Sequence, residues 1–322
     1  MRPLLVVLLA LACAGCGGGV AGDTVEERAR LLLDFQPNGV HAGIYLADAR
    51  AYDDAEGVQM DILTPGASTD ALRTLQAGQV DVAILDIHDL GLARERGADL
   101  VGFAAVVQRP LAAVLAQPEV RSPRDLEGRR AGVTGLPSDE AVLRTVVRGG
   151  GGDPARVREV TIGFEAVRAL VAGRVAAATA FWNVEGVALR AKRPQMREFR
   201  VEDYGAPAYP ELVLVTTPQE LEEERDGLDA LVRALRRGYE EAQRDPESAA
   251  TAIVDAERRL DRDAVLREID AVAPAWTAGA AAWGQLRRDV LEAWARWDVA
   301  TGILRRPPAL DRAFALDVGA PS

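Results

Sequence analysis

Residues 34–43 read Asp-Phe-Gln-Pro-Asn-Gly-Val-His-Ala-Gly and place an aromatic ring, two amides and a histidine where a strand should end. An amide both donates and accepts hydrogen bonds, which suits a heterocycle with both functions on one edge. Open α/β sheets hold ligands at the carboxyl ends of their parallel strands. Phe35, Asn38 and His41 are therefore candidate binding residues. The alternative is that Asn38 only turns the chain and His41 caps or packs.

A second polar cluster lies at residues 181–186, which read Phe-Trp-Asn-Val-Glu-Gly after an apolar run. The indole of Trp182 could stack a flat ring, a contact worth about 0.5 to 1.5 kcal/mol beyond burial. Asn183 and Glu185 could bind the polar edge of that ring, and a hydrogen bond to a charged group is worth about 1.5 to 3 kcal/mol. A few such contacts approach the roughly 8 kcal/mol that micromolar binding requires.

Residues 135–140 read Gly-Leu-Pro-Ser-Asp-Glu and predict a turn from a strand into a helix, with Ser138 as the N-cap. Free N–H groups at such a helix start favour a carbonyl, carboxylate or phosphate. Asp139 and Glu140 partly fill that role themselves, so simple capping is the alternative. After the strand expected at residues 80–85, Asp89 is likewise predicted as an N-cap rather than a ligand contact.

Composition excludes several classes of function. Only two cysteines and two histidines occur among 322 residues, which excludes a Cys/His zinc cluster and a disulfide framework and leaves little for Cys-His or Ser-His catalysis. The chain has no Gly-x-Ser-x-Gly, no Gly-x-x-x-x-Gly-Lys and no paired-histidine motif, so we predict no catalytic residue, metal or cofactor. A formal charge of -11 argues against a nucleic-acid binder.

The elements that must position these residues alternate between strand and helix, which predicts βα units and a largely parallel sheet. The first set of strands is expected at residues 30–35, 58–63, 80–85 and 100–107, and the second at residues 130–133, 157–162 and 176–181. The apolar run 212–216 is predicted to return the chain to the first lobe, and from residue 218 the pattern is helical. Four tryptophans in this tail are predicted to pack in the core: Trp276, Trp283, Trp294 and Trp297.

The amino terminus predicts export. Residues 4–14 carry no charge but are too short for a membrane span, which needs about 20 residues. Small residues precede Cys16 and glycines follow it, which is typical of a bacterial lipoprotein cleavage box. We predict a signal peptide at 1–15 and a lipid-anchored flexible tether at 16–29. Cys13 is a weaker candidate for lipidation, and an ordinary secretory signal is the alternative.

Residues 33–45, Leu-Asp-Phe-Gln-Pro-Asn-Gly-Val-His-Ala-Gly-Ile-Tyr, resemble the opening motif of the thiamine-pyrimidine-precursor family. That family comprises ThiY-like substrate-binding proteins of ABC transporters, similar to SsuA-type binding proteins, and related pyrimidine synthases. The likeness continues through further ordered motifs at residues 65–75, 107–111, 135–140 and 181–186. It covers about residues 31–217, and the helical tail more loosely.

The resemblance implies a two-lobed α/β fold of the type II periplasmic-binding-protein kind, with a hinge and a ligand cleft between the lobes. Residues 30–117 and 212–322 would form lobe 1, and residues 118–211 lobe 2. The ligand-binding residues expected in the cleft are Phe35, Asn38, His41, Gln108, Gly135, Pro137, Ser138, Asp139, Trp182, Asn183, Glu185 and Tyr209. Phe35-Gln36 stands where pyrimidine transporters often show Trp-Tyr, which removes one stacking ring. The enzymatic branch relies on a cysteine-rich iron motif, for which this chain lacks the cysteines.

These observations together predict a lipid-anchored substrate-binding protein on the extracytoplasmic face of the cell membrane. It would capture a small planar heterocycle, such as a thiamine pyrimidine precursor, and deliver it to an ABC permease driven by an ATPase. Phe35 and Trp182 would stack the ring, and the Ser138 helix end would bind a polar substituent. Two alternatives remain: the same fold binding riboflavin, an alkanesulfonate or a nitrate-like anion, and a pyrimidine-forming enzyme with His41 as a reactant.

Overall fold

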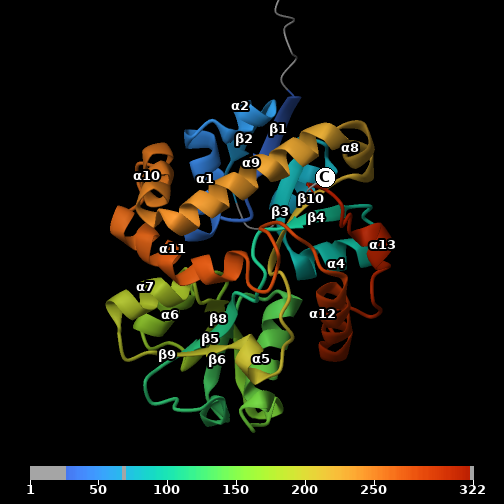
Figure 1. The fold of residues 1–322 in the computed structure, drawn as a ribbon. Helices are drawn as coiled ribbons and strands as arrows, with labels where there is room; N and C mark the ends of the chain where they lie inside the picture. The colour runs from blue at the N-terminus through green and yellow to red at the C-terminus, as the bar shows by residue number, and fades with distance from the viewer. Residues whose placement is uncertain (1–26, 67–69, 320–322) are drawn as a thin grey trace, which may run out of the picture.

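The computed structural model describes residues 27–66 and 70–319 and folds them into two five-stranded sheets flanked by helices (Figure 1). The first sheet has the order β2-β1-β3-β10-β4 and the second the order β7-β6-β8-β5-β9. The strands of the first sheet are β1 (Glu27–Leu32), β2 (Val58–Leu63), β3 (Val82–Asp86), β10 (Leu212–Thr216) and β4 (Val101–Ala105). Those of the second are β7 (Arg158–Thr161), β6 (Arg130–Val133), β8 (Ala177–Phe181), β5 (Ala112–Ala116) and β9 (Arg197–Arg200).

Helices cover the faces of both sheets (Figure 1). Those before the return to the first sheet are α1 (Ala42–Ala49), α2 (Tyr52–Glu56), α3 (Asp70–Gln76), α4 (Ile87–Glu95), α5 (Pro137–Gly149), α6 (Ala166–Val171) and α7 (Glu185–Lys192). Those of the tail are α8 (Pro218–Glu223), α9 (Arg225–Arg244), α10 (Pro246–Ala256), α11 (Arg262–Trp276), α12 (Arg288–Thr301) and α13 (Leu310–Ala313). Short 3-10 helices are η1 (Gly39–His41), η2 (Pro123–Leu126), η3 (Pro154–Arg156) and η4 (Val201–Tyr204). Among the described residues, no helix is both long and apolar enough to cross a bilayer.

Each sheet is largely parallel, as predicted, with one opposing strand. Strands β1, β2 and β3 run parallel, and β10 pairs antiparallel with both β3 and β4. In the second sheet β5 likewise runs antiparallel to β8 and β9. The opposing strands β5 and β10 are the ones that enter each sheet directly from the other one. Strands β5 and β9 were also missing from the predicted elements.

The chain crosses between the sheets twice, through residues 106–111 and again through residues 205–211. Strand β10 returns to the first sheet between β3 and β4, as the apolar run 212–216 predicted. The first boundary differs from the expected one, because β5 precedes residue 118 and yet belongs to the second sheet. The remaining lobe boundaries stay a prediction.

The amino-terminal predictions lie mostly outside the described residues. The signal peptide at 1–15, Cys13 and Cys16 all fall there, as does the tether up to residue 26. Strand β1 begins at Glu27 and pairs along its length with β2. The tether predicted to reach residue 29 therefore ends at least three residues earlier, because residues 27–29 already belong to the sheet.

Helix α9 crosses α1 at close range and fixes the helical tail to the first sheet (Figure 1). Its apolar face is buried at Leu228, Leu231, Val232 and Leu235, which recur at helical spacing. Glycines allow the close approach, since a methyl group on Gly238 would lie 2.0 Å from the Gly43 carbonyl oxygen. The neighbouring Tyr239 stacks on Trp283 with ring centroids 4.3 Å apart. All four tail tryptophans are buried, which confirms their predicted packing role.

We expect Gly238→Ala to lower the free energy of unfolding by about 1 to 3 kcal/mol, because the added methyl group overlaps the α1 backbone. Gly227→Ala on the same helix is the control. Its methyl group meets only the end of the flexible Glu27 side chain, and alanine favours a helix over glycine by about 1 kcal/mol. Urea denaturation measures both variants. Equal stability of the two would contradict the close packing of α9 on α1.

Candidate ligand-binding cleft

A cavity of about 140 Å³ lies between the two sheets and takes its lining from both. The loop after β1 supplies Asp34 and Phe35, and the end of β3 supplies Leu85 and Asp86. The second sheet contributes residues at the end of β8 and in the first turn of α5. The cavity therefore occupies the position expected for a ligand cleft between lobes.

Asn183, directly after β8, is the most unusual polar group in this cavity. Its side chain is completely buried, and neither Oδ1 nor Nδ2 has a hydrogen-bond partner. A buried polar atom without a partner costs about 1 to 3 kcal/mol. Asn183 thus offers one donor and one acceptor to the interior of the cavity at a standing energetic cost.

Two phenylalanines face each other at the cavity from opposite sheets. The ring centroids of Phe35 and Phe164 lie 6.2 Å apart, with 39° between their planes. Phe164 is 52% exposed, so this ring is available to a ligand or to solvent. It was missed in the sequence because Ile162 and Gly163 separate it from β7, and no polar residue type marks the position. A phenylalanine two residues after a predicted strand end was the available signal.

Five carboxyl side chains line the cavity, and its described lining includes no lysine, arginine or histidine. They are Asp34, Asp86, Asp89, Asp139 and Glu185. Burial raises the pKa of Glu185, although backbone N–H groups, including that of Phe181 at 3.2 Å, oppose the shift. Burial likewise raises the pKa of Asp89. The cavity therefore disfavours anions and offers hydrogen-bonding carboxyl groups to a neutral or basic ligand.

Asn38 forms part of the cavity wall, and His41 is buried behind that wall. His41 is completely buried outside the lining, with Nε2 2.9 Å from Asp34 Oδ1 and Nδ1 accepting from the Asn38 N–H at 3.3 Å. Asn38 lines the cavity, but its Oδ1 accepts from Val40 N–H and its Nδ2 donates to the Gln36 carbonyl, both at 2.9 Å. The amide of Asn38 is therefore used as the N-cap of η1.

Trp182 does not reach the cavity in this structure. Its side chain is buried, its Nε1 donates to the Pro110 carbonyl at 3.0 Å, and the Arg200 guanidinium lies 3.9 Å from its ring centroid. Arg200 already covers the Trp182 ring, so in this structure Trp182 does not stack on a ligand as predicted. Phe35, Phe164 and Phe181 are the aromatic residues in the cavity lining instead.

The remaining predicted residues divide between the cavity and the hinge. Ser138 and Asp139 line the cavity, whereas Gly135 and Pro137 are not part of its lining. Gln108 and Tyr209 lie on the two crossings. Gln108 donates to the Gln285 carbonyl at 2.8 Å, and Tyr209 stacks on Trp297 with ring centroids 5.6 Å apart.

Two predicted N-caps were wrong by a few residues. Leu136 is the N-cap of α5 and Pro137 its first residue, so Ser138 already lies inside the first turn. The Asp139 carboxylate accepts instead from the Thr134 N–H at 2.9 Å. In α4 the N-cap is Asp86, because the helix begins earlier than the sequence predicted, and Asp89 faces the cavity.

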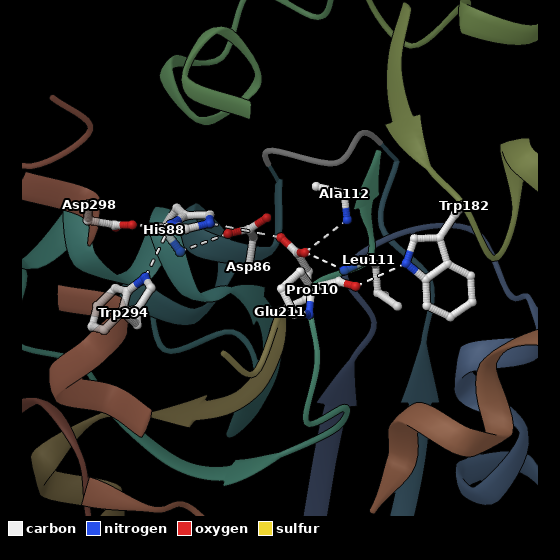
Figure 2. A network of polar contacts seen from close by, with 9 residues as sticks. All are labelled: Asp86, His88, Pro110, Leu111, Ala112, Trp182, Glu211, Trp294 and Asp298. Carbon is white, nitrogen blue, oxygen red and sulfur yellow. Dashed lines mark hydrogen bonds and ion pairs between the residues drawn. The ribbon is translucent and has the colours of Figure 1, made fainter. Parts of the chain in front are cut away.

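A buried network connects the cavity to the hinge (Figure 2). Glu211, directly before β10, accepts from the N–H groups of Leu111 and Ala112 at 2.5 and 3.1 Å and so joins the two crossings. His88 lies 4.0 Å from Glu211 and 2.8 Å from Asp298 on α12. Burial alone would lower the pKa of His88, but the negative charges of Asp298, Asp86 and Glu211 outweigh it and raise the pKa to about 10. These carboxylates therefore favour a positive charge at this position, which a proton on His88 supplies when no other cation is bound.

The scan against family models matches residues 38–249 to "NMT1/THI5 like". A formylaminopyrimidine-binding protein of Halalkalibacterium halodurans is 34% identical over 255 residues, which cover 78% of this chain and 77% of that protein. The phosphate synthase THI12 of Saccharomyces cerevisiae, which by name makes 4-amino-5-hydroxymethyl-2-methylpyrimidine phosphate, is 22% identical over 74% of this chain and 73% of that protein. The Escherichia coli aliphatic sulphonate binding protein SsuA has the same fold, with a TM-score of 0.73, 13% identity and coverage of 91% and 99%.

Glu268 on α11 is a buried carboxyl group near the cleft whose pKa links stability to pH. Its carboxylate accepts from the Gly39 N–H at 3.0 Å, and burial together with the charge of Glu185 raises its pKa from 4.5 to about 7 despite that hydrogen bond. Between these pH values the folded chain holds a proton that the unfolded chain releases. Stability therefore falls as pH rises from about 4.5 to 7.

We expect Glu268→Gln to be more stable than the wild type by about 1 to 3 kcal/mol at pH 8 and to lose that advantage at pH 4.5. Glutamine keeps an acceptor for Gly39 without a charge. The exposed Glu240 on α9 provides a control substitution, Glu240→Gln. Denaturant unfolding at both pH values measures the difference, and a gain that is independent of pH would contradict the buried carboxyl.

Proposed function

The chain belongs to the NMT1/THI5-like family, and from that premise we propose that it is the substrate-binding component of an ABC importer. It captures a small, planar aminopyrimidine such as a formylaminopyrimidine outside the cytoplasmic membrane and delivers it to a permease. The curated relative at 34% identity binds a formylaminopyrimidine, according to its name. The solved structures with this fold include import binding proteins.

The observation that carries this proposal is the unpartnered, fully buried amide of Asn183. An aminopyrimidine presents a ring nitrogen acceptor beside an amino donor on one edge. The amide Nδ2 can donate to that ring nitrogen while Oδ1 accepts from the amino group, so both unpartnered atoms gain a bond at once. Glu185 and Asp89 line the same cavity and accept or share further protons of the ligand.

The charge of the cavity argues against the anionic ligands of related folds. A sulfonate or nitrate would enter a space lined by five carboxyl side chains and by no basic residue among those described. Repulsion between the ligand's negative charge and these carboxylates would weaken binding in a buried environment.

The position of His41 favours a binding protein over a pyrimidine-forming enzyme. Both ring nitrogens of His41 make hydrogen bonds, and the side chain has no exposed surface and no place in the cavity lining. A reactant histidine needs contact with its partner. The phosphate carried by the product of the yeast synthases would also meet the carboxyl groups of this cavity.

Closure of the two lobes provides the transport mechanism. Phe35 belongs to the first lobe, whereas Asn183 and Phe164 belong to the second, so only a closed arrangement lets one ligand touch all three. A ligand that contacts both lobes shifts the equilibrium toward closure by its differential affinity. The permease then distinguishes the loaded form from the empty form by shape.

We expect Asn183→Ala to weaken binding of a formylaminopyrimidine at least tenfold, because two hydrogen bonds worth about 1 kcal/mol each are lost. Gln219→Ala removes an exposed amide on α8, outside the cleft, and should leave affinity unchanged. Isothermal titration calorimetry measures all three proteins. Unchanged affinity of Asn183→Ala, or tighter binding of methanesulfonate or nitrate than of the pyrimidine, would refute the proposed ligand class.

The proposal includes a lipid anchor at Cys16, which lies outside the described residues. We expect Cys16→Ser to move the protein from the membrane fraction to the soluble extracytoplasmic fraction, since serine cannot carry the thioether lipid. Cys13→Ser is the matched control and should remain in the membrane fraction. Fractionation of cells expressing each variant decides the matter. The opposite pattern would assign the anchor to Cys13.

A further inference from the structure

Three side chains of types that can bind metals, two from one turn and one from a distant segment, meet between the cavity and the hinge (Figure 2). Asp86 ends β3, His88 lies in the first turn of α4, and Glu211 directly precedes β10. One ligand atom of each lies within 4.8 Å of the other two. Two of the residues are fully buried and the third, Asp86, also lines the cavity.

Each of these side chains is fixed by an atom that does not face the other two. Asp86 Oδ1 accepts from the His88 N–H at 2.7 Å. His88 Nδ1 contacts the Asp298 carboxylate, and Glu211 Oε2 accepts from two backbone N–H groups of the first crossing. A carboxylate bonded to the far nitrogen of an imidazole is the common way in which proteins orient a metal-binding histidine.

The atom that faces the group is left without a partner. His88 Nε2 is buried, makes no hydrogen bond and lies 4.0 Å from Glu211 Oε1. The Trp294 indole N–H also points at Nδ1, at 3.2 Å, but the Asp298 carboxylate is nearer, at 2.8 Å, and accepts a hydrogen bond from Nδ1. In that tautomer Nε2 turns a lone pair toward two carboxylates. That arrangement is unfavourable unless a cation or a proton lies between them.

The net charge of the group also requires an added cation or proton. Three carboxylates, those of Asp86, Glu211 and Asp298, surround one imidazole in a buried region. A single proton on His88 leaves two negative charges uncompensated when all three acids are ionised. Sharing of protons between Asp86 and Glu211 is one solution, and a divalent cation is the other.

We propose that Asp86, His88 and Glu211 bind a divalent transition-metal ion, with Zn²⁺ as the preferred cation. One imidazole nitrogen and two carboxylate oxygens are donors that Zn²⁺ accepts, at bond lengths of about 2.0 to 2.2 Å. Such bonds place ligand atoms roughly 3.4 Å apart in a tetrahedron, so the side chains close inward from their present separations. Because Asp86 lines the cavity, the fourth position faces the ligand space.

This site shares Asp86 with the cavity lining, but its test needs no pyrimidine and so does not depend on the proposed ligand. Chelator-treated, untagged full-length protein is titrated with ZnCl₂ in a calorimeter at pH 7.5. We expect one binding event at His88 with a dissociation constant of micromolar or below. MgCl₂ should give at least a hundredfold weaker binding, since Mg²⁺ demands octahedral oxygen ligands.

The chain offers a matched control because it holds only two histidines. His88→Gln should lose this zinc event or weaken it at least tenfold, whereas His41→Gln should retain it within twofold. The thiols of Cys13 and Cys16 are common to both variants, so they cannot produce a difference between them. Equal zinc binding by the two histidine variants would overturn the proposal, as would a wild type that binds no zinc.

A second substitution keeps the test decisive if His88→Gln fails to fold. Asp86→Asn removes one ligand at the cavity edge, and we expect at least tenfold weaker zinc binding. Asp89→Asn changes the neighbouring cavity acid outside the group and should leave zinc affinity unchanged. Substitution with Co²⁺ adds a spectroscopic readout, since a tetrahedral site containing a nitrogen ligand gives visible absorption. Loss of that absorption in Asp89→Asn but not in Asp86→Asn would contradict the ligand assignment.

Discussion

The carboxylate of Glu211 is the contact on which the geometry of the cleft depends. It accepts two N–H groups where the chain first enters the second sheet, and it belongs to the segment by which the chain leaves that sheet. The two crossings are therefore joined by a buried, charge-assisted pair of hydrogen bonds, a type stronger than neutral ones. Burial raises the pKa of Glu211, but these N–H groups and His88 favour its ionised form. The charge of the Glu211 side chain thus strengthens the contact that holds the two crossings together.

Uncompensated polar groups are concentrated around this contact and in the cavity beside it. Asn183, His88 Nε2 and the Tyr209 hydroxyl are all buried without a hydrogen-bond partner. Such groups destabilise the folded chain, and in a binding site a ligand that supplies the missing hydrogen bonds gains affinity. Two further unpartnered buried atoms, Trp276 Nε1 and Arg287 Nε, lie in the helical tail. The buried strands β4, β5 and β10, by contrast, carry almost only aliphatic residues.

Sequence periodicity predicted the strands whose neighbours in the chain are helices, because each βα unit ends in a turn with its own residue signature. The runs 58–63, 130–133 and 212–216 match β2, β6 and β10 residue for residue. It failed for β5, which is rich in alanine and so has low strand propensity, and for β9, in which three of the four residues are charged. For the cleft, residue type located Asn183 and Glu185 but misplaced Trp182, since only the fold shows that Arg200 covers its ring. The group of Asp86, His88 and Glu211 lay beyond any local pattern, because two residues from one turn meet a third 123 positions after His88.

The phenylalanine pair sets a limit on how a planar ligand enters. A ring held between two others needs about 7 Å between their centroids, twice the carbon contact distance of about 3.5 Å. Phe35 and Phe164 lie 6.2 Å apart and are tilted by 39°, which is too close and too oblique for a sandwich. A pyrimidine must therefore lie against one of the rings, or binding must separate them. Because the rings belong to opposite lobes, the second case is met either by motion at the hinge or by a new rotamer of Phe164, which is half exposed and free to turn toward solvent. The aromatic contact then reports on closure as well as on affinity.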